Sequence, residues 1–242
     1  YTRTIVGSQV GEFWGYESDG IFQSQDEIDA LTYEDDNGVT QLTYGSNVGP
    51  GDYRYVDRNK DGQLNEEDKV KIGSPYPDFT MGITGDISYK GFDFNLFIYW
   101  SYGNEIFNTV KVFTETPYEQ TNMSSYMLTD AWRPDNTTAT IAQLGGDRQN
   151  NYSRSSDRFI ENGTFLRFKN ISLGYTIPEN VSRKVNIEKL RFYVALQNYF
   201  TITKYSGRDP ELGSTWGVFV QKADLGNYTI PKTLNFGINA SF

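Results

Sequence analysis

The chain has 242 residues, a net charge of −9, and neither cysteine nor histidine. The acidic balance argues against a nucleic-acid partner. The missing cysteine excludes a disulfide framework and a thiol site, and the missing histidine removes the commonest general base. Aromatic residues make up 16% of the sequence, although the mean hydropathy is −0.58 and no long apolar run occurs. This composition excludes transmembrane helices and suits a membrane β-barrel, in which every second residue of a strand is polar.

The first fifty residues are rich in turns and carry one helix signal. Ser24 precedes acidic residues and an apolar spacing of three to four that extends to Leu31. A serine cap of this kind predicts one short helix. The chain begins with Tyr1 and not with Met, and no signal peptide opens it, so we expect a piece of a longer precursor.

A candidate metal loop occupies residues 57–68, with the sequence DRNKDGQLNEED. Its oxygen-bearing residues follow the EF-hand spacing, in which loop positions 1, 3, 5, 7 and 12 bind calcium and a glycine at position 6 makes the turn. Hard oxygen donors favour calcium over softer ions. We expect a structural calcium with six or seven ligands, among them Asp57, Asn59, Asp61, Asp68 and the backbone carbonyl of Gln63.

Two features depart from an ordinary EF-hand. Position 12 is Asp68 and not Glu, which resembles the calcium loops of dockerin repeats, and no amphipathic helix precedes the loop. The alternative interpretation is an Asx-rich turn that holds itself together without metal. Glu66, Glu67 and Asp68 could also suggest the paired carboxylates of a glycosidase, but cap or calcium-loop acids explain them better.

A long hairpin is predicted for residues 79–102. Its residues alternate between an apolar and a polar face, so two strands are expected, each with one apolar side. Lys90 and Gly91 separate the strands and predict a tight turn. Each strand has roughly ten residues, the length that crosses a bilayer at a tilt. We expect Phe94, Leu96 and Ile98 to face lipid, and Asp93, Asn95 and Tyr99 to face the lumen or a plug.

Further alternating strands follow later in the chain. They are expected at residues 164–177, 190–197 and 233–242, and a change of parity in the first of them indicates a bulge near Asn170. The links at 90–91 and 178–188 are short, whereas those at 103–162 and 203–230 are long. The second long link contains the motif Arg208-Asp-Pro-Glu211. Alternating short turns and long outer loops are typical of outer-membrane barrels.

Several segments resemble a known family. They are YVDRNKDGQLNEEDKVKIGSPYPDFTMGITGDISYKGFDF, FLRFKNISLGYTIP, the run RFYVALQNYFTITKYSGRDPE and the terminal PKTLNFGINASF. In this order they are similar to the C-terminal part of SusC/RagA-type TonB-dependent transporters of the Bacteroidetes outer membrane. The resemblance covers nearly the whole chain and implies an all-β fold, the last strands of a barrel of about 22 strands.

The resemblance also implies a division of the chain and a function. Residues 1–78 would form an outer loop region with the EF-hand-like loop, and residues 79–242 the C-terminal barrel strands with their long extracellular loops, while the plug domain is absent. The protein would import glycans or peptides with a SusD-like surface lipoprotein, and TonB would act through the missing N-terminal part. Phe242 resembles the aromatic C-terminus that serves as an assembly signal.

The alternative from another class is a soluble, calcium-stabilised β domain that binds carbohydrate. Trp14, Trp132 and Trp216 could then stack on sugars, although aromatic residues at membrane interfaces are equally expected. No acid pair with catalytic support is found, so an enzyme is not predicted. The substrate and the residues that contact it are not predicted by the sequence.

Overall fold

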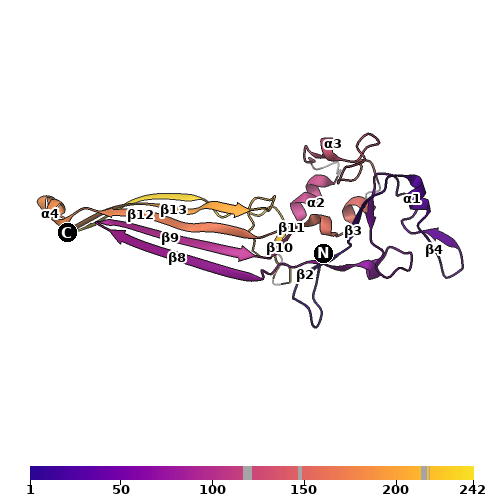
Figure 1. Ribbon diagram of the computed structural model, residues 1–242, viewed down its shortest axis with the longest axis horizontal. Helices are drawn as coiled ribbons and strands as arrows, with labels where there is room; N and C mark the ends of the chain where they lie inside the picture. Colours follow the sequence, from indigo (N-terminus) through magenta and orange to yellow (C-terminus); the bar gives the residue numbers. More distant parts are fainter. Residues whose placement is uncertain (117–121, 147–148, 214–216, 218) are drawn as a thin grey trace. The chain divides into compact units, whose positions relative to one another are not determined.

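The structure is a computed structural model that describes residues 1–116, 122–146, 149–213, 217 and 219–242 (Figure 1). The chain forms two compact units. Unit 1 contains residues 1–75, 105–161 and 212–226, and unit 2 contains residues 76–104, 162–211 and 227–242. Unit 1 thus combines most of the expected outer loop region with much of the two long loops. Trp216 lies outside the described residues.

Unit 2 is a single antiparallel sheet of five strands in the order β15-β13-β12-β9-β8 (Figure 1). Each predicted strand is present, and β13 is longer than expected because it continues past a bulge. The bounds are β8 Phe79–Tyr89, β9 Phe92–Tyr102, β12 Phe165–Thr176, β13 Lys189–Thr203 and β15 Thr233–Ser241.

The hairpin of β8 and β9 has the tight turn that the sequence predicts. Lys90 has a φ of 46° and Gly91 a φ of 85°. Two positive φ values in a two-residue loop match the right-handed twist of the flanking strands. Glycine accepts this backbone without strain, and a Cβ at Gly91 would meet the carbonyl oxygen of Thr176 on the neighbouring strand.

The predicted bulge near Asn170 is confirmed. Between the level of Leu96 and that of Ile98 on β9, strand β12 inserts Lys169, so that Ile171 pairs with Leu96 and Phe168 with Ile98. A bulge bends the strand and re-aims the side chains beyond it. The change of parity in the sequence therefore keeps the apolar residues of β12 on one face.

Strand β13 adds residues at the same level. Phe168 pairs with Phe200, whereas Asn170 pairs with Gln197, so two residues of β13 lie opposite one residue of β12. One of the two is Asn198, which has a φ of 53°. Asparagine tolerates the left-handed region better than most residues do.

A helical link replaces the plain polar link expected at 178–188. It contains α4 Glu179–Ser182 and the 3-10 helix η4 Arg183–Val185, which ends at Asn186 with a φ of 57°. The turn closes where the backbone N–H of Glu188 donates to the carbonyl of Ser241 on β15.

Unit 1 contains several small sheets of short strands. The sheets have the orders β1-β2-β7, β11-β10-β14, β3-β6 and β4-β5. Strand β10 pairs in parallel with β14, so the middle of the loop after β13 adds a strand to this unit. The bounds are β1 Thr2–Arg3, β2 Glu12–Gly15, β3 Ser18–Ile21, β4 Thr32–Glu34, β5 Thr40–Leu42, β6 Tyr53–Tyr55, β7 Val70–Gly73, β10 Glu105–Asn108, β11 Ile160–Asn162 and β14 Ala223–Asp224.

The helices of unit 1 are short. Helix α1 Gln25–Asp29 confirms the predicted helix, because the side chain of Ser24 accepts from the backbone N–H of Glu27. Helices α2 Thr109–Glu115 and α3 Met127–Asp130 follow in the loop after β10, and further single turns are η1 Glu66–Asp68, η2 Gln149–Ser153 and η3 Asp157–Phe159. Among the described residues, no helix is long and apolar enough to cross a membrane.

The interior of unit 1 is aromatic. One cluster packs Phe13 against Phe107 and Phe159, and a larger one gathers Tyr16, Ile21, Tyr53, Tyr55, Trp132 and Ala142. Phe22, Ile28 and Val48 form a third. These clusters bury large side chains away from water, which is the usual driving force for a compact unit in aqueous surroundings.

Candidate functional site

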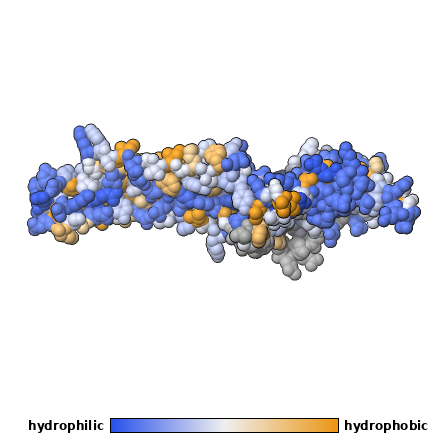
Figure 2. All heavy atoms as spheres, turned by 90° about the horizontal axis from the view of Figure 1, so that it is seen from below, coloured by the Kyte–Doolittle hydropathy of each residue, from blue (hydrophilic) through white to orange (hydrophobic). Residues whose placement is uncertain are grey.

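The sheet of unit 2 has one continuous apolar face. Cross-strand pairs join apolar side chains at successive levels, from Tyr89–Phe92–Tyr175 near the short turns to Met81–Trp100–Leu166 near the long loops. Many of these side chains are exposed, from 39% for Met81 to 77% for Phe236. Figure 2 shows orange and pale patches between blue ones along this unit. The apolar face contains Phe79, Met81, Ile83, Ile87, Tyr89, Phe92, Phe94, Leu96, Ile98, Trp100, Tyr102, Leu166, Phe168, Ile171, Leu173, Tyr175, Leu190, Phe192, Val194, Leu196, Phe200, Ile202, Leu234, Phe236 and Ile238.

Aromatic residues gather at both ends of the apolar face. At the turn end the rings of Phe92 and Tyr175 lie 4.5 Å apart, and at the loop end Phe79 stacks on Tyr102 at 5.2 Å and meets Trp100 at 5.0 Å. From Phe92 to Tyr102 the strand extends about 33 Å. At the tilt of barrel strands this is roughly 25 Å of height, the span of an apolar band between two aromatic girdles.

The opposite, polar face carries paired charges. Arg191 of β13 reaches across β12 to Asp93 of β9, with Nε 2.9 Å from Oδ1. The guanidinium passes over Gly174, where any Cβ would collide with it. Asn95 donates to Asp86 at 2.7 Å and accepts from Asn170. The predicted alternation is confirmed, since Asp93 and Asn95 lie on the face opposite the apolar side chains; that the apolar face meets lipid stays a prediction.

A second ion cluster lies above the bulge on the same polar face. Arg167 contacts Asp209 at 2.5 Å and Glu211 at 2.7 Å, and Lys169 contacts Glu211 at 2.6 Å. Burial alone would raise the pKa of Asp209. The hydrogen bond from Arg167 and those from the backbone N–H groups of Glu211 and Ile230 outweigh burial, so the pKa of Asp209 is lowered. Asp209 and Glu211 belong to the Arg208-Asp-Pro-Glu211 motif, whose partners a sequence pattern could not identify.

The predicted metal loop lies in unit 1 between β6 and β7. Lys60 has a φ of 61° and Gly62 a φ of 81°, so the chain bends sharply as the spacing predicts. The carboxylate of Asp57 accepts from the backbone N–H of Lys60 at 2.7 Å and of Gly62 at 2.8 Å. Asp61 accepts from the N–H of Gln63 at 2.7 Å. The loop is therefore organised around its own carboxylates.

Asp68 closes this loop. Its side chain is fully buried and accepts from the backbone N–H groups of Arg58 and Asn65, both at 2.8 Å. Asn59 donates to Asp61 at 2.8 Å. Within the described ranges no group of three or more Asp, Glu, His or Cys side chains is arranged to hold a metal. These hydrogen bonds fit the self-contained Asx turn, and the calcium prediction remains a proposal.

Two of the side chains considered for sugar stacking, Trp14 and Trp132, make contacts within unit 1. The guanidinium of Arg3 lies 3.5 Å from the ring centre of Trp14. Trp132 is buried, its Nε1 donates to Gln23 at 2.9 Å, and its ring lies against Gly51. Of the acidic residues 66–68 that could suggest a glycosidase, Glu66 pairs with Lys69 at 2.7 Å, so its carboxylate is part of a surface ion pair.

A buried ion pair supports the loops of unit 1. Glu115 contacts Arg158 at 3.1 Å and accepts from the hydroxyl of Tyr126 at 2.9 Å. The guanidinium carbon of Arg158 also lies over the ring of Tyr53, 3.5 Å from its centre. Burial, together with the negative charge of Glu115, raises the pKa of Tyr126 to about 12. The charges are therefore paired and enclosed by aromatic rings.

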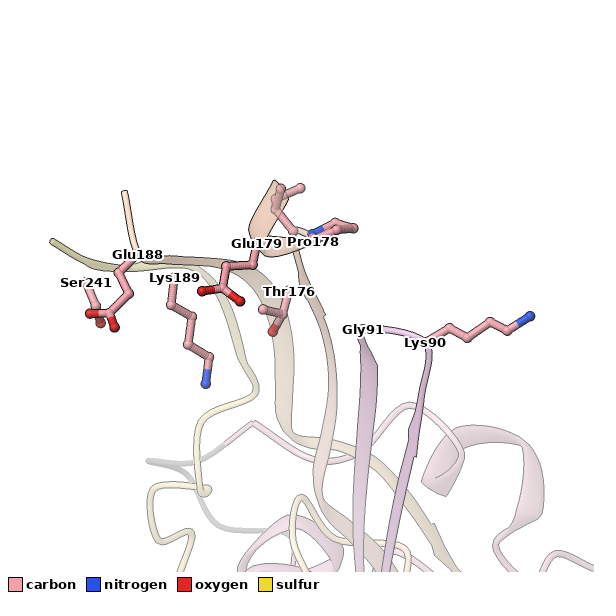
Figure 3. Close-up of a pocket in the computed structure, with 9 residues that line it drawn as sticks. Lys90, Gly91, Thr176, Pro178, Glu179, Glu188, Lys189 and Ser241 are labelled. Carbon is pink, nitrogen blue, oxygen red and sulfur yellow. The ribbon is translucent and has the colours of Figure 1, made fainter. Parts of the chain in front are cut away.

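An open hollow of about 730 Å³ lies at the turn end of the sheet. Lys90, Gly91, Thr176, Pro178, Glu179, Glu188, Lys189 and Ser241 line it (Figure 3). In this view Lys90 extends away from the other side chains. The two lysines balance the two glutamates, so the lining gives the hollow no net charge that would define a ligand.

Comparisons with known proteins agree with this geometry. No family model matches the chain. TonB-dependent receptor P3 of Formosa agariphila is 31% identical over 98% of the chain, and TonB-dependent receptor SusC of Bacteroides thetaiotaomicron is 35% identical over 84%. The chain spans 22% and 19% of these relatives. The solved RagAB peptide transporter is similar over 97% of the chain and 23% of its own, with a TM-score of 0.69 and 23% identity.

Five antiparallel strands with an apolar outer band define part of a membrane β-barrel. The chain belongs to the SusC/RagA-type family of TonB-dependent receptors. The predicted fold class is confirmed: the chain is all-β and its sheet is part of a transmembrane barrel. The predicted location in the outer membrane is confirmed as well.

Proposed function

We propose that this chain is the C-terminal part of an outer-membrane importer, where it supplies five of about 22 barrel strands and their outer loops. The apolar face of unit 2 carries the proposal, because such a face on long tilted strands suits contact with lipid. The short links at 90–91 and 178–188 would face the periplasm. The long loops that build unit 1 would then lie outside the cell.

The importer would take up glycans or peptides. The RagAB structure that this chain resembles is that of a peptide transporter, which supports uptake of a nutrient larger than an ion. A SusD-like surface lipoprotein would bind at the outer loops, and TonB would act through the N-terminal part of the full-length receptor. A transporter needs no catalytic residues, and we assign none.

The test uses the full-length receptor. It should be extracted from the outer membrane only with detergent, and it should copurify with a lipoprotein. Uptake of labelled oligosaccharides or peptides should require both the receptor and TonB. Recovery of the receptor in the aqueous phase without detergent would overturn the proposal in favour of a soluble, calcium-stabilised domain that binds carbohydrate. Uptake that survives deletion of TonB would refute energised import.

The terminal residue has a separate role in this proposal. Phe242 follows β15 and is 89% exposed. We propose that it serves as the signal for barrel assembly. Phe242→Ala should reduce the amount of assembled receptor in the membrane, whereas Ser241→Ala should not. Equal assembly of both variants would sink this assignment.

We also propose a structural calcium ion in loop 57–68. Asp57, Asn59, Asp61 and Asp68 would supply side-chain oxygens and Gln63 its backbone carbonyl. The spacing and the positive φ of Gly62 support the proposal. A Cβ at Gly62 would meet Tyr33 of β4, so the loop lies against the β4–β5 hairpin. Ordering the loop would therefore also steady this hairpin.

Metal analysis of the purified receptor tests this second proposal. One calcium per protein is expected, and Asp61→Ala should lose it. Asp35→Ala is a matched control, since Asp35 also accepts backbone N–H groups in an exposed turn of unit 1 but lacks the spacing. Calcium that persists in Asp61→Ala would contradict the site.

A further inference from the structure

The Asp209-Pro210-Glu211 segment is bound to the polar face of the sheet. It follows β13, yet it contacts β12, whose Arg167 lies 42 residues away from Asp209 in the sequence. Arg167 uses all three of its nitrogen groups, because Nε also donates to Thr201 at 2.9 Å. The segment is therefore fixed at a defined height above the bulge.

The same carboxylate holds the other end of the loop. Asp209 accepts from the backbone N–H of Ile230 at 3.2 Å, a few residues before β15 begins. Residues 204–211 and 227–232 are the two stems of the last long loop, and the middle of this loop belongs to unit 1. One side chain thus ties both stems to β12.

The contact between Arg167 and Asp209 is buried. The side chain of Arg167 is 4% exposed and that of Asp209 is 7% exposed. Salt and water screen such a pair far less than a surface pair. Buried ion pairs are weak sources of net stability but impose a definite geometry, since either charge is costly without its partner. Arg167 and Asp209 are therefore suited to positioning.

We propose that Asp209 and Glu211 form a latch that holds the last long loop to the inner wall of the barrel. The latch consists of Arg167, Lys169, Asp209 and Glu211. It sets how far the stems of this loop stand from the wall. The statement that the last long loop lies outside the cell rests on the proposed function, whereas the contacts of the latch do not depend on it.

Trypsin cleavage after Arg208 measures the latch. In the latched state the bond between Arg208 and Asp209 adjoins a buried side chain, so cleavage requires the stem to open. The full-length receptor in detergent micelles is digested, and the rate at Arg208 is normalised to that of a peptide with the same local sequence. D209N/E211Q should be cleaved at least about tenfold faster, because cleavage follows the population of the opened form.

Two further variants separate a latch from general damage. R167Q/K169Q/D209N/E211Q removes the latch without leaving an unpaired charge, and it should be cleaved as fast as D209N/E211Q. D93N/R191Q removes the other ion pair of the same polar face and should leave cleavage unchanged. Heat-modifiable migration on a gel confirms that each barrel has assembled.

The outcomes are distinct. Wild-type rates in both latch variants overturn the proposal, as does equal acceleration in D93N/R191Q. Protection that returns in the four-residue variant also overturns it, because the unpaired charges alone would then explain the opening. Latch-dependent cleavage in micelles, with none in trypsin-treated cells, supports the latch and contradicts the proposed outward orientation.

Discussion

Phe13 and Phe236 belong to one chain, but Phe13 is fully buried in unit 1 whereas Phe236 is 77% exposed on the sheet of unit 2. Unit 1 packs its aromatic rings inward around small sheets. Unit 2 arranges its apolar side chains over one face of a single sheet. The same residue type therefore has opposite burial in the two regions, which is expected when one region faces water and the other lipid.

Charge follows the same division. In unit 1 the acidic residues outnumber the basic ones two to one, whereas in unit 2 the basic residues are slightly more numerous. The net charge of the chain thus arises from the loops. Like charges on a surface keep a protein region soluble, and charges facing lipid are costly, so both distributions suit the proposed media.

The largest effect is expected from breaking the buried ion pair of unit 1. Glu115→Ala leaves Arg158 without its carboxylate and Tyr126 without its acceptor. It should lower the free energy of unfolding of unit 1 by about 3–5 kcal/mol. Lys111→Ala, which removes a longer contact of 3.6 Å to the same carboxylate, is the control and should cost well under that.

Hydrogen exchange measured by mass spectrometry checks this pair of variants. Faster exchange in Glu115→Ala should be confined to peptides of unit 1, and those of the sheet should keep their protection. Uniform acceleration over both units would show that the two regions do not unfold separately.

A charge placed on the apolar face should come next. Leu96 lies at the middle level of β9, and Leu96→Arg should cost roughly 2–4 kcal/mol near the bilayer midplane. Asn95→Arg puts the same side chain on the polar face beside Asp86 and should be better tolerated. Reconstitution into vesicles, followed by denaturant titration, compares the two. Similar losses for both would contradict the assignment of faces.

Alkaline pH should lower the stability of unit 1 but not that of unit 2. Burial raises the pKa of Tyr44 and of Tyr152 to about 12, above the usual value near 10. Since the folded state holds these protons more tightly, their contribution is complete below about pH 10 and is lost as the pH rises through about 12. Unit 1 should therefore lose stability over this range, while the sheet of unit 2 should not.

In a variant whose other tryptophans are replaced by phenylalanine, fluorescence of Trp132 reports on unit 1, and far-ultraviolet circular dichroism reports mainly on the sheet. The fluorescence transition should come first on raising the pH. Tyr44→Phe removes the hydroxyl that bridges to the backbone of Tyr55, so it should change the midpoint of unit 1 alone. Coincident transitions of the two signals would oppose this expectation.

The smallest effect concerns acid and the latch. The pKa of Asp209 is lower in the folded state than the usual aspartate value near 4. The stabilising contribution of Asp209 is therefore complete above about pH 4 and is lost as the pH falls through its pKa in the folded state. Asp209→Asn should flatten the decline of the denaturant midpoint below about pH 4. An identical decline in Asp209→Asn and wild type would remove Asp209 from this account.

The strands of unit 2 could be predicted because their signals are local. Alternation fixes the faces of β8 and β9, and the paired positive φ values of the turn follow from Lys90-Gly91. The bulge at Lys169 could be inferred from a parity change within a single strand. The extra residue of β13 opposite this bulge could not be inferred, because nothing in the local pattern of β13 marks Asn198.

The candidate sites were harder to predict because their partners are distant in sequence. Arg167 binds Asp209 across 42 residues, and Trp132 packs on Gly51, which lies far from it in the sequence. Short strands such as β10 and β14 have too few residues for alternation to show. Such contacts depend on how the loops cross, which periodicity does not encode.

Lipid accessibility along β9 tests the central claim most directly. The chain has no cysteine, so single cysteines can carry a spin label at each position from Asp93 to Trp100. In bilayers, collision with dissolved oxygen should be high for labels at Phe94, Leu96 and Ile98 and low at Asn95 and Tyr99. Accessibility without a period of two, or with the opposite phase, would contradict an apolar face turned toward lipid.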